Sequence, residues 1–127
     1  MKAKFDLEER RLDYAADIVR FTDGMNRSPA GIHVAGQLLR SGTAALPNHG
    51  EAQAAESPAD FIHKMSLCLK ELRETRRWLL LAHRVPLVRL PVVVAPLLQE
   101  NDELIRIFFA SIGTARKRAF ALRAHER

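Results

Sequence analysis

Residues 40–79, RSGTAALPNHGEAQAAESPADFIHKMSLCLKELRETRRWL, decide the fold of this 127-residue chain. Their second half carries apolar or small residues at alternating spacings of four and three through three heptads. These residues are Phe61, Met65, Cys68, Leu72, Thr75, Leu79 and, just beyond the quoted stretch, Ala82. A seam of that regularity is typical of helices that pack at shallow angles in a bundle.

The start of this helix is marked by three residues of the same stretch. Ser57 suits the N-cap, Pro58 suits the first helical position, and Asp60 places a negative charge in the first turn. The sequence therefore predicts a helix over residues 58–85.

A second helix is predicted over residues 29–56, before that restart. Pro47 removes one backbone hydrogen bond inside it, so we expect a kink there and not a break. Its apolar face is made mainly of small residues, which let helix axes approach closely. The face comprises Ile32, Ala35, Leu38, Leu39, Gly42, Ala45 and Leu46.

Two further helices are predicted over residues 6–25 and 92–123. The first carries the stripe Leu7, Tyr14, Ile18, Phe21 and Met25, with Leu12, Ala15 and Val19 beside it. The last is expected to bury Leu97, Leu104, Ile105, Phe108, Phe109, Ile112, Ala115 and Ala119. Four helices joined by short connections predict an all-α, antiparallel up-down-up-down four-helix bundle, with residues 1–127 as a single domain.

Composition narrows the class of protein. A hydrophobic fraction of 47% and a charged fraction of 28% are typical of a folded globular chain. The lone Cys68 excludes an internal disulfide and a multi-cysteine metal site, and its place in the seam indicates a core residue. Charged residues at 1–11 and three prolines in the apolar run 85–98 argue against a signal peptide and a membrane span. We therefore expect a cytoplasmic protein.

The net charge of +5 is divided unevenly along the chain. Residues 1–63 carry 7 lysines and arginines against 9 acidic residues, a net charge of −2, whereas residues 64–127 carry 13 against 6, a net charge of +7. Two interpretations remain open: a solvated helix surface of mixed charge, and a surface that attracts nucleic acid or an acidic partner.

The candidate nucleic-acid-binding residues lie in this basic half. Lys70, Arg73 and Arg77 form a stripe on the predicted third helix, and Arg116, Lys117 and Arg118 cluster near the end of the fourth. In the alternative interpretation, Glu71, Glu74 and Glu103 partly neutralise them. Trp78 is expected to pack at a helix or subunit contact and not to stack a base.

A second candidate is a structural polar clasp. Asn48 and Glu51 share a helix face beside Pro47, where they could satisfy freed backbone groups or pair with an arginine such as Arg40 across an interface. An enzymatic interpretation rests only on these two residues and the histidines. No histidine pair has the i, i+4 spacing of a helical metal site, so we expect no metal, no cofactor and no catalytic residue.

Short motifs along nearly the whole chain resemble the four-helix-bundle family of 23S rRNA-intervening-sequence proteins. They are Arg40-Ser41, Asn48, Glu51, Phe61, Lys70-Glu71-Leu72, residues 103–107 (ELIRI) and Ala115-Arg116. Family members typically read Asn-Ile-Ala-Glu-Gly at the turn, where this chain has His49, Gly50 and Ala52 instead of Ile, Ala and Gly.

The resemblance implies a small cytoplasmic bundle that assembles as a ring, commonly a pentamer. The accessory protein of diversity-generating retroelements is similar in fold, and it binds nucleic acid and a reverse transcriptase through basic surfaces. We therefore expect a non-enzymatic homo-oligomer, with a further partner that is RNA, DNA or a nucleic-acid enzyme. The alternative is a protein–protein scaffold that binds no nucleic acid.

Overall fold

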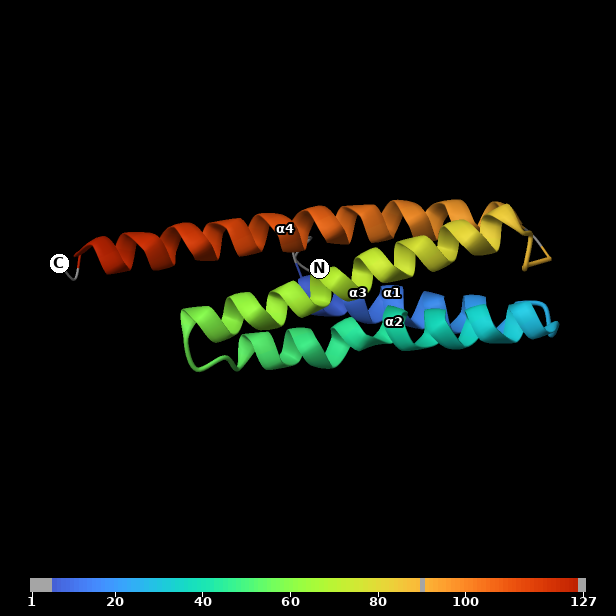
Figure 1. The fold of residues 1–127 in the computed structure, drawn as a ribbon, viewed down its shortest axis with the longest axis horizontal. Helices are drawn as coiled ribbons and strands as arrows, with labels where there is room; N and C mark the ends of the chain where they lie inside the picture. Colours follow the sequence, from blue (N-terminus) through green and yellow to red (C-terminus); the bar gives the residue numbers. More distant parts are fainter. Residues whose placement is uncertain (1–5, 90, 126–127) are drawn as a thin grey trace.

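The computed structural model describes residues 6–89 and 91–125, and it is an all-α single domain (Figure 1). Its elements are α1 (Leu7–Asp23), α2 (Pro29–Gln53), α3 (Pro58–Arg84), the 3₁₀ turn η1 (Pro91–Val93) and α4 (Val94–His125). Sequential helices pack on one another, and α1 closes the bundle against α4. The predicted up-down four-helix bundle is confirmed.

Polar caps fix where the first three helices begin. The Asp6 carboxylate accepts from the backbone N–H of Glu9, and the Ser28 hydroxyl accepts from that of Gly31. The Ser57 hydroxyl accepts from the N–H of Asp60, as the sequence predicted. Each contact satisfies a first-turn donor that has no partner within its helix.

The start of α4 differs slightly from the predicted boundary. Val92 and Val93 lie in η1, and α4 begins at Val94, two residues later than expected. Pro96 then falls in the first turn, where its missing N–H removes no intrahelical hydrogen bond. The side chain of Val94 is buried and anchors this end of α4 in the core.

Helices α1 and α2 approach closely through a glycine. A Cβ atom on Gly42 would lie 2.6 Å from the Cγ2 atom of Ile18, so only hydrogen fits there. Pro47 lies inside α2 without ending it, as expected from its place in the pattern. At Gly42, therefore, α2 packs directly against α1.

The heptad seam of α3 forms the centre of the core. Met65, Cys68, Leu72, Leu79 and Ala82 are all buried, which confirms Cys68 as a core residue. At one end of the bundle the backbone N–H of residue 26 donates to the carbonyl of residue 87 at 2.8 Å. That bond ties the α1–α2 connection to the α3–α4 connection.

Three side chains that the sequence assigned to buried faces are exposed instead. Ile32 is 61% exposed, Leu39 is 43% exposed and Phe109 is 64% exposed. A bundle helix buries only a stripe of its surface, and these positions lie at the edge of or outside that stripe. For these three residues the prediction was wrong.

Helix α4 is the longest element and extends past the connection between α2 and α3 (Figure 1). Its last turns therefore lie beyond the ends of the other three helices. Residues 1–5, cited above for their charges, lie outside the described residues. Within residues 6–89 and 91–125, no helix is long and apolar enough to cross a membrane.

Candidate nucleic-acid interface

Helices α3 and α4 form a basic groove with a volume of about 380 Å³. Positions 70, 73 and 77 are separated by three and four residues, so they share one face of α3. Position 116 on α4 faces the same groove. The basic groove is lined by Ser66, Leu69, Lys70, Arg73, Arg77, Phe109, Ile112, Gly113 and Arg116.

The structure brings together four of the six predicted nucleic-acid-binding residues, namely Lys70, Arg73, Arg77 and Arg116. The other two lie apart from them. Arg118 lines a separate hollow of about 410 Å³ near the α2–α3 connection, and Lys117 is an exposed residue that lines neither hollow. The candidate interface is therefore centred on α3 and one side of α4.

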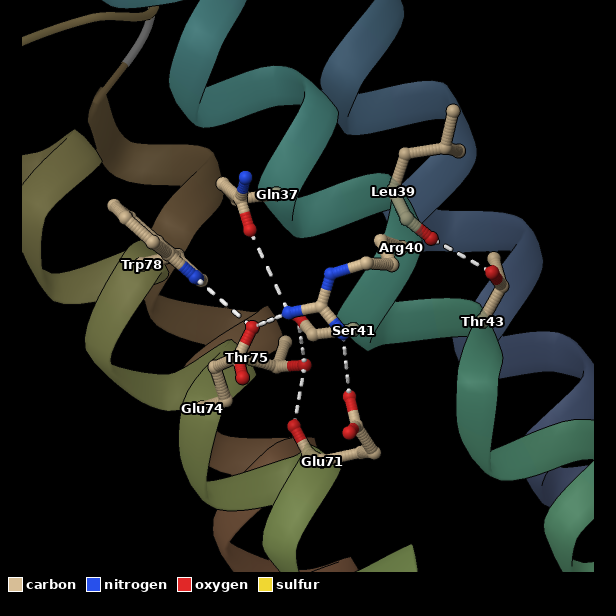
Figure 2. A network of polar contacts seen from close by, with 9 residues as sticks. All are labelled: Gln37, Leu39, Arg40, Ser41, Thr43, Glu71, Glu74, Thr75 and Trp78. Carbon is tan, nitrogen blue, oxygen red and sulfur yellow. Dashed lines mark hydrogen bonds and ion pairs between the residues drawn. The ribbon is translucent and has the colours of Figure 1, made fainter.

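Glu71 and Glu74 of α3 point toward Arg40 of α2 (Figure 2), and neither lines the groove. The Arg40 guanidinium forms ion pairs with Glu74 and with Glu71, the latter at 3.2 Å. Glu74 also accepts a hydrogen bond from the Trp78 indole at 3.3 Å, and Trp78 packs edge-on against His33 of α2. Trp78 thus lies at a helix contact, as expected.

The acidic residues of α4 also form ion pairs with arginines outside the groove. Arg10 of α1 donates to Glu100 at 2.7 Å and to Glu103 at 2.9 Å, and the Glu100 hydrogen bond raises the pKa of Arg10. Arg76 donates to Asp102 at 2.9 Å. Glu71, Glu74 and Glu103, the three carboxylates expected to neutralise the basic stripe, are therefore paired elsewhere.

The four groove cations consequently have no carboxylate partner among the described residues. All four side chains are exposed. A groove lined by charges of one sign concentrates its field between low-dielectric walls and attracts an anionic chain. The geometry suits a phosphate backbone, which is recognised by charge and not by base identity.

Sequence reasoning missed the aromatic residue of this groove. Phe109 was assigned to the buried face of α4 together with Phe108, and only Phe108 is buried. A step of one residue turns a helix by about 100°, which moves Phe109 from the core to the groove. Its spacing from Arg116, seven positions, was the available signal.

A larger groove of about 580 Å³ lies between the end of α1 and the start of α4. Its lining is mainly apolar and includes Phe21, Val88 and Leu97. Two of its charged residues, Asp17 and Arg20, form an ion pair with each other at 3.1 Å. Despite its size, this groove offers less uncompensated charge than the one between α3 and α4.

The residues of the predicted polar clasp occupy different places. Arg40 pairs with α3, whereas Glu51 is exposed and lies 3.6 Å from the amino group of Lys64. Asn48 is half-buried, and among the described residues no hydrogen bond joins it to Arg40 or Glu51. The structure thus brings Arg40 to α3 and not to the turn beside Pro47.

The buried polar residue of that turn is His49. Its Nδ1 atom accepts from the Nε of Arg11 at 3.0 Å, and Arg11 also donates to the carbonyl of Ala45 at 2.7 Å. Both side chains are almost fully buried, Arg11 at 3% and His49 at 4% exposed. An accepting Nδ1 requires the neutral imidazole with its proton on Nε2.

Burial shifts the pKa values of the ionisable groups in and around this pair. Burial, assisted by the neighbouring Arg11 charge, lowers the pKa of His49 to about 4. Burial also lowers the pKa of Arg11 and raises that of Cys68 to about 11. The sequence held one signal for the pair: Arg11 fills the gap between Leu7 and Tyr14 on an apolar face.

The clasp residues are not assembled at one place, and the buried pair is engaged within the core. His49 is engaged by Arg11, and the Cys68 thiol faces the Ala45 carbonyl at 3.8 Å inside the core. In the part of the chain that the structure describes, no three His, Cys, Asp or Glu side chains gather as a metal site would require. The basic groove is therefore the best candidate for function.

Comparison with known proteins identifies a family and a similar solved structure. The sequence model of a family described as 23S rRNA-intervening sequence protein matches residues 4–110. A crystal structure of a protein with unknown function from the S23 ribosomal protein family, from Bacteroides thetaiotaomicron, is similar to this chain. It shares 30% identity and a TM-score of 0.75, over 84% of this chain and 97% of that one. No match was found among curated proteins.

Proposed function

We propose that this chain, which belongs to the 23S rRNA-intervening sequence protein family, is a non-enzymatic homo-oligomer that binds nucleic acid through the basic groove. One observation carries this proposal. Lys70, Arg73, Arg77 and Arg116 line one groove, and the carboxylates of the neighbouring helices are paired with other cations.

Uncompensated cations release counterions from a nucleic acid when they contact its phosphates. Four such contacts on a single strand correspond to a slope of about −3 in log affinity against log salt. Raising the salt from about 50 to about 200 mM should then weaken binding roughly 50-fold. Affinity should depend little on sequence, because phosphate contacts carry no base information.

Fluorescence anisotropy with labelled RNA and DNA at these two salt concentrations tests the proposal. Arg73→Glu removes one groove cation and adds a repulsive charge, so it should weaken binding at least tenfold at low salt. Arg27→Glu, in the connection between α1 and α2, changes the net charge equally outside the groove and should have little effect. Equal losses in the two variants, or no binding at low salt, would contradict the proposal.

The homo-oligomer is supported by apolar side chains that the single chain leaves exposed. On α1, Leu12 is 49% and Val19 is 38% exposed, and they lie seven positions apart on one face. Ile32 and Leu39 repeat that spacing on α2. Such pairs suit a subunit contact, and we propose a ring, with the pentamer that the family resemblance implies.

Sedimentation velocity at micromolar concentration tests the assembly. A mass near five subunits supports the pentamer, and a monomer would refute the ring. Leu12→Glu places a charge in the proposed contact and should shift the mass toward the monomer, whereas Arg27→Glu should not.

A second candidate function is a protein–protein scaffold that binds no nucleic acid. The same exposed apolar pairs on α1 and α2 favour it. In that case Arg73→Glu leaves assembly unchanged, and neither RNA nor DNA binds at low salt. The anisotropy and sedimentation measurements together distinguish the two functions.

A further inference from the structure

We propose that the basic groove and the free end of α4 bind a single strand of nucleic acid, whose bases stack on Phe109 and Phe120. This inference rests on the proposed function and specifies its ligand. The structural observation behind the inference is a pair of aromatic rings that face solvent beside unpaired cations. Phe109 is 64% exposed and Phe120 is 70% exposed.

The two rings belong to one row along α4. Positions 109, 113, 116, 120 and 123 follow at spacings of four, three, four and three, so they share a helix face. The row combines two aromatic residues, two arginines and one glycine: Phe109, Gly113, Arg116, Phe120 and Arg123. Its first three members line the basic groove, and the other two continue the row toward the C-terminal end.

The position of this row explains why the rings stay exposed. Phe120 lies five residues before the end of α4 and belongs to none of the buried faces of the bundle. The last turns of α4 extend past the connection between α2 and α3 (Figure 1). Eleven residues separate the two rings, which is a rise of roughly 16 Å along the helix. That distance is about five stacked nucleotides.

A single strand fits these features better than a duplex does. The bases of a duplex are already stacked within the helix, whereas those of a single strand offer free faces to aromatic side chains. Cations that track the backbone beside aromatic stacking platforms are typical of proteins that bind single strands without sequence preference.

A second copy of this row is a poorer occupant. In a ring, where different surfaces meet, a role of the row as a subunit contact is tested by the mass measurement below. A two-fold contact, where each subunit presents the same surface, would bring Arg116 and Arg123 of one subunit against the same cations of the other. Like charges at close range oppose such a contact. A polyanion is attracted by the same charges, so charge complementarity selects the nucleic acid.

The experiment compares single strands of about 12 nucleotides with a duplex of the same length. Phe109→Leu and Phe120→Leu keep an apolar side chain but remove the stacking face. Each should weaken single-strand binding at least about fivefold, leave duplex binding unchanged and preserve the salt dependence. Val92→Ala, at an equally exposed position of η1, is the matched control and should leave binding unchanged.

The outcomes separate this inference from the proposed function. Equal affinity for single strand and duplex, with no effect of the phenylalanine variants, overturns the stacking inference and leaves the basic groove as a duplex or general phosphate site. No binding of either probe at low salt overturns both. A change of oligomeric mass in the phenylalanine variants, with binding intact, would identify the row as a subunit contact and also overturn the inference.

Discussion

Helix α3 has two polar sides that differ in how their charges are used. The side toward α2 carries Glu71 and Glu74, which share Arg40, and a Thr75 hydroxyl 2.8 Å from that of Ser41 (Figure 2). The side that faces the basic groove carries three cations that have no carboxylate partner in residues 6–89 and 91–125, whereas Arg76 pairs with Asp102 of α4.

The difference shows that charge counts along a helix do not reveal which charges cancel. Glu71 follows Lys70 directly in the sequence, yet adjacent residues point about 100° apart on a helix. The charges of the acidic side are neutralised by Arg40 of α2, and the basic side is open to solvent. We conclude that one side serves packing and the other is available for a ligand.

The largest expected effect is a loss of stability at Leu79, two positions from a residue that should affect binding only. Leu79 is fully buried, so Leu79→Ala leaves a cavity and should lower the free energy of unfolding by about 2–5 kcal/mol. Arg77→Ala, on the open side, should change it by less than about 0.5 kcal/mol while it weakens nucleic-acid binding. Urea unfolding and anisotropy measure the two quantities.

Comparable losses of stability in both variants would show that Arg77 contributes to packing. Binding by Leu79→Ala should be measured where the variant is still folded, as checked by circular dichroism. Retained affinity there would show that the core and the groove act separately.

The next effect is a loss of stability at low pH, caused by the buried His49. The pKa of His49 is about 4 in the folded protein and near 6.5 in an unfolded chain. Between these values the unfolded chain binds a proton that the folded chain does not, so stability falls as the pH falls. The stability that this histidine contributes is complete above pH 6.5 and drops by about 3 kcal/mol at pH 4.

Denaturant titrations from pH 7 to pH 4 measure this loss. His49→Gln keeps an acceptor for Arg11 but does not titrate, so its stability should fall less over the same range. Parallel curves for the two proteins would show that carboxylates, and not His49, govern the acid response.

The smallest effect concerns the paired side of α3. Arg40 is half-exposed, and exposed ion pairs contribute little, so Arg40→Ala should cost less than about 1 kcal/mol. Nucleic-acid affinity should stay the same, because Arg40 lies outside the groove. A marked loss of affinity would show that the freed Glu71 and Glu74 neutralise the groove cations, and it would contradict this prediction.

The fold followed from the sequence because repeated local signals agreed. The heptads of α3, the cap at Ser57 and the prolines at helix starts all indicated the same four helices. Such signals act within one or two turns of a helix. They specify which residues are helical and which stripe is buried.

The site followed only in part, because it depends on contacts between helices. Periodicity placed Lys70, Arg73 and Arg77 on one face, but it could not place Arg116 beside them and Lys117 away from them. It also could not show that Arg40 would form ion pairs with Glu71 and Glu74 of α3. Phe109 was misplaced because a run of two phenylalanines does not indicate which ring turns inward.

The reactivity of the buried Cys68 thiol measures how often the helices of the bundle separate. Cys68 is the only thiol in the chain, it is fully enclosed, and its raised pKa leaves little reactive thiolate near neutral pH. An alkylating reagent can reach it only in molecules whose helices have separated. The rate of modification therefore reports how often the bundle opens, and a bound nucleic acid that holds α3 against α4 should slow it.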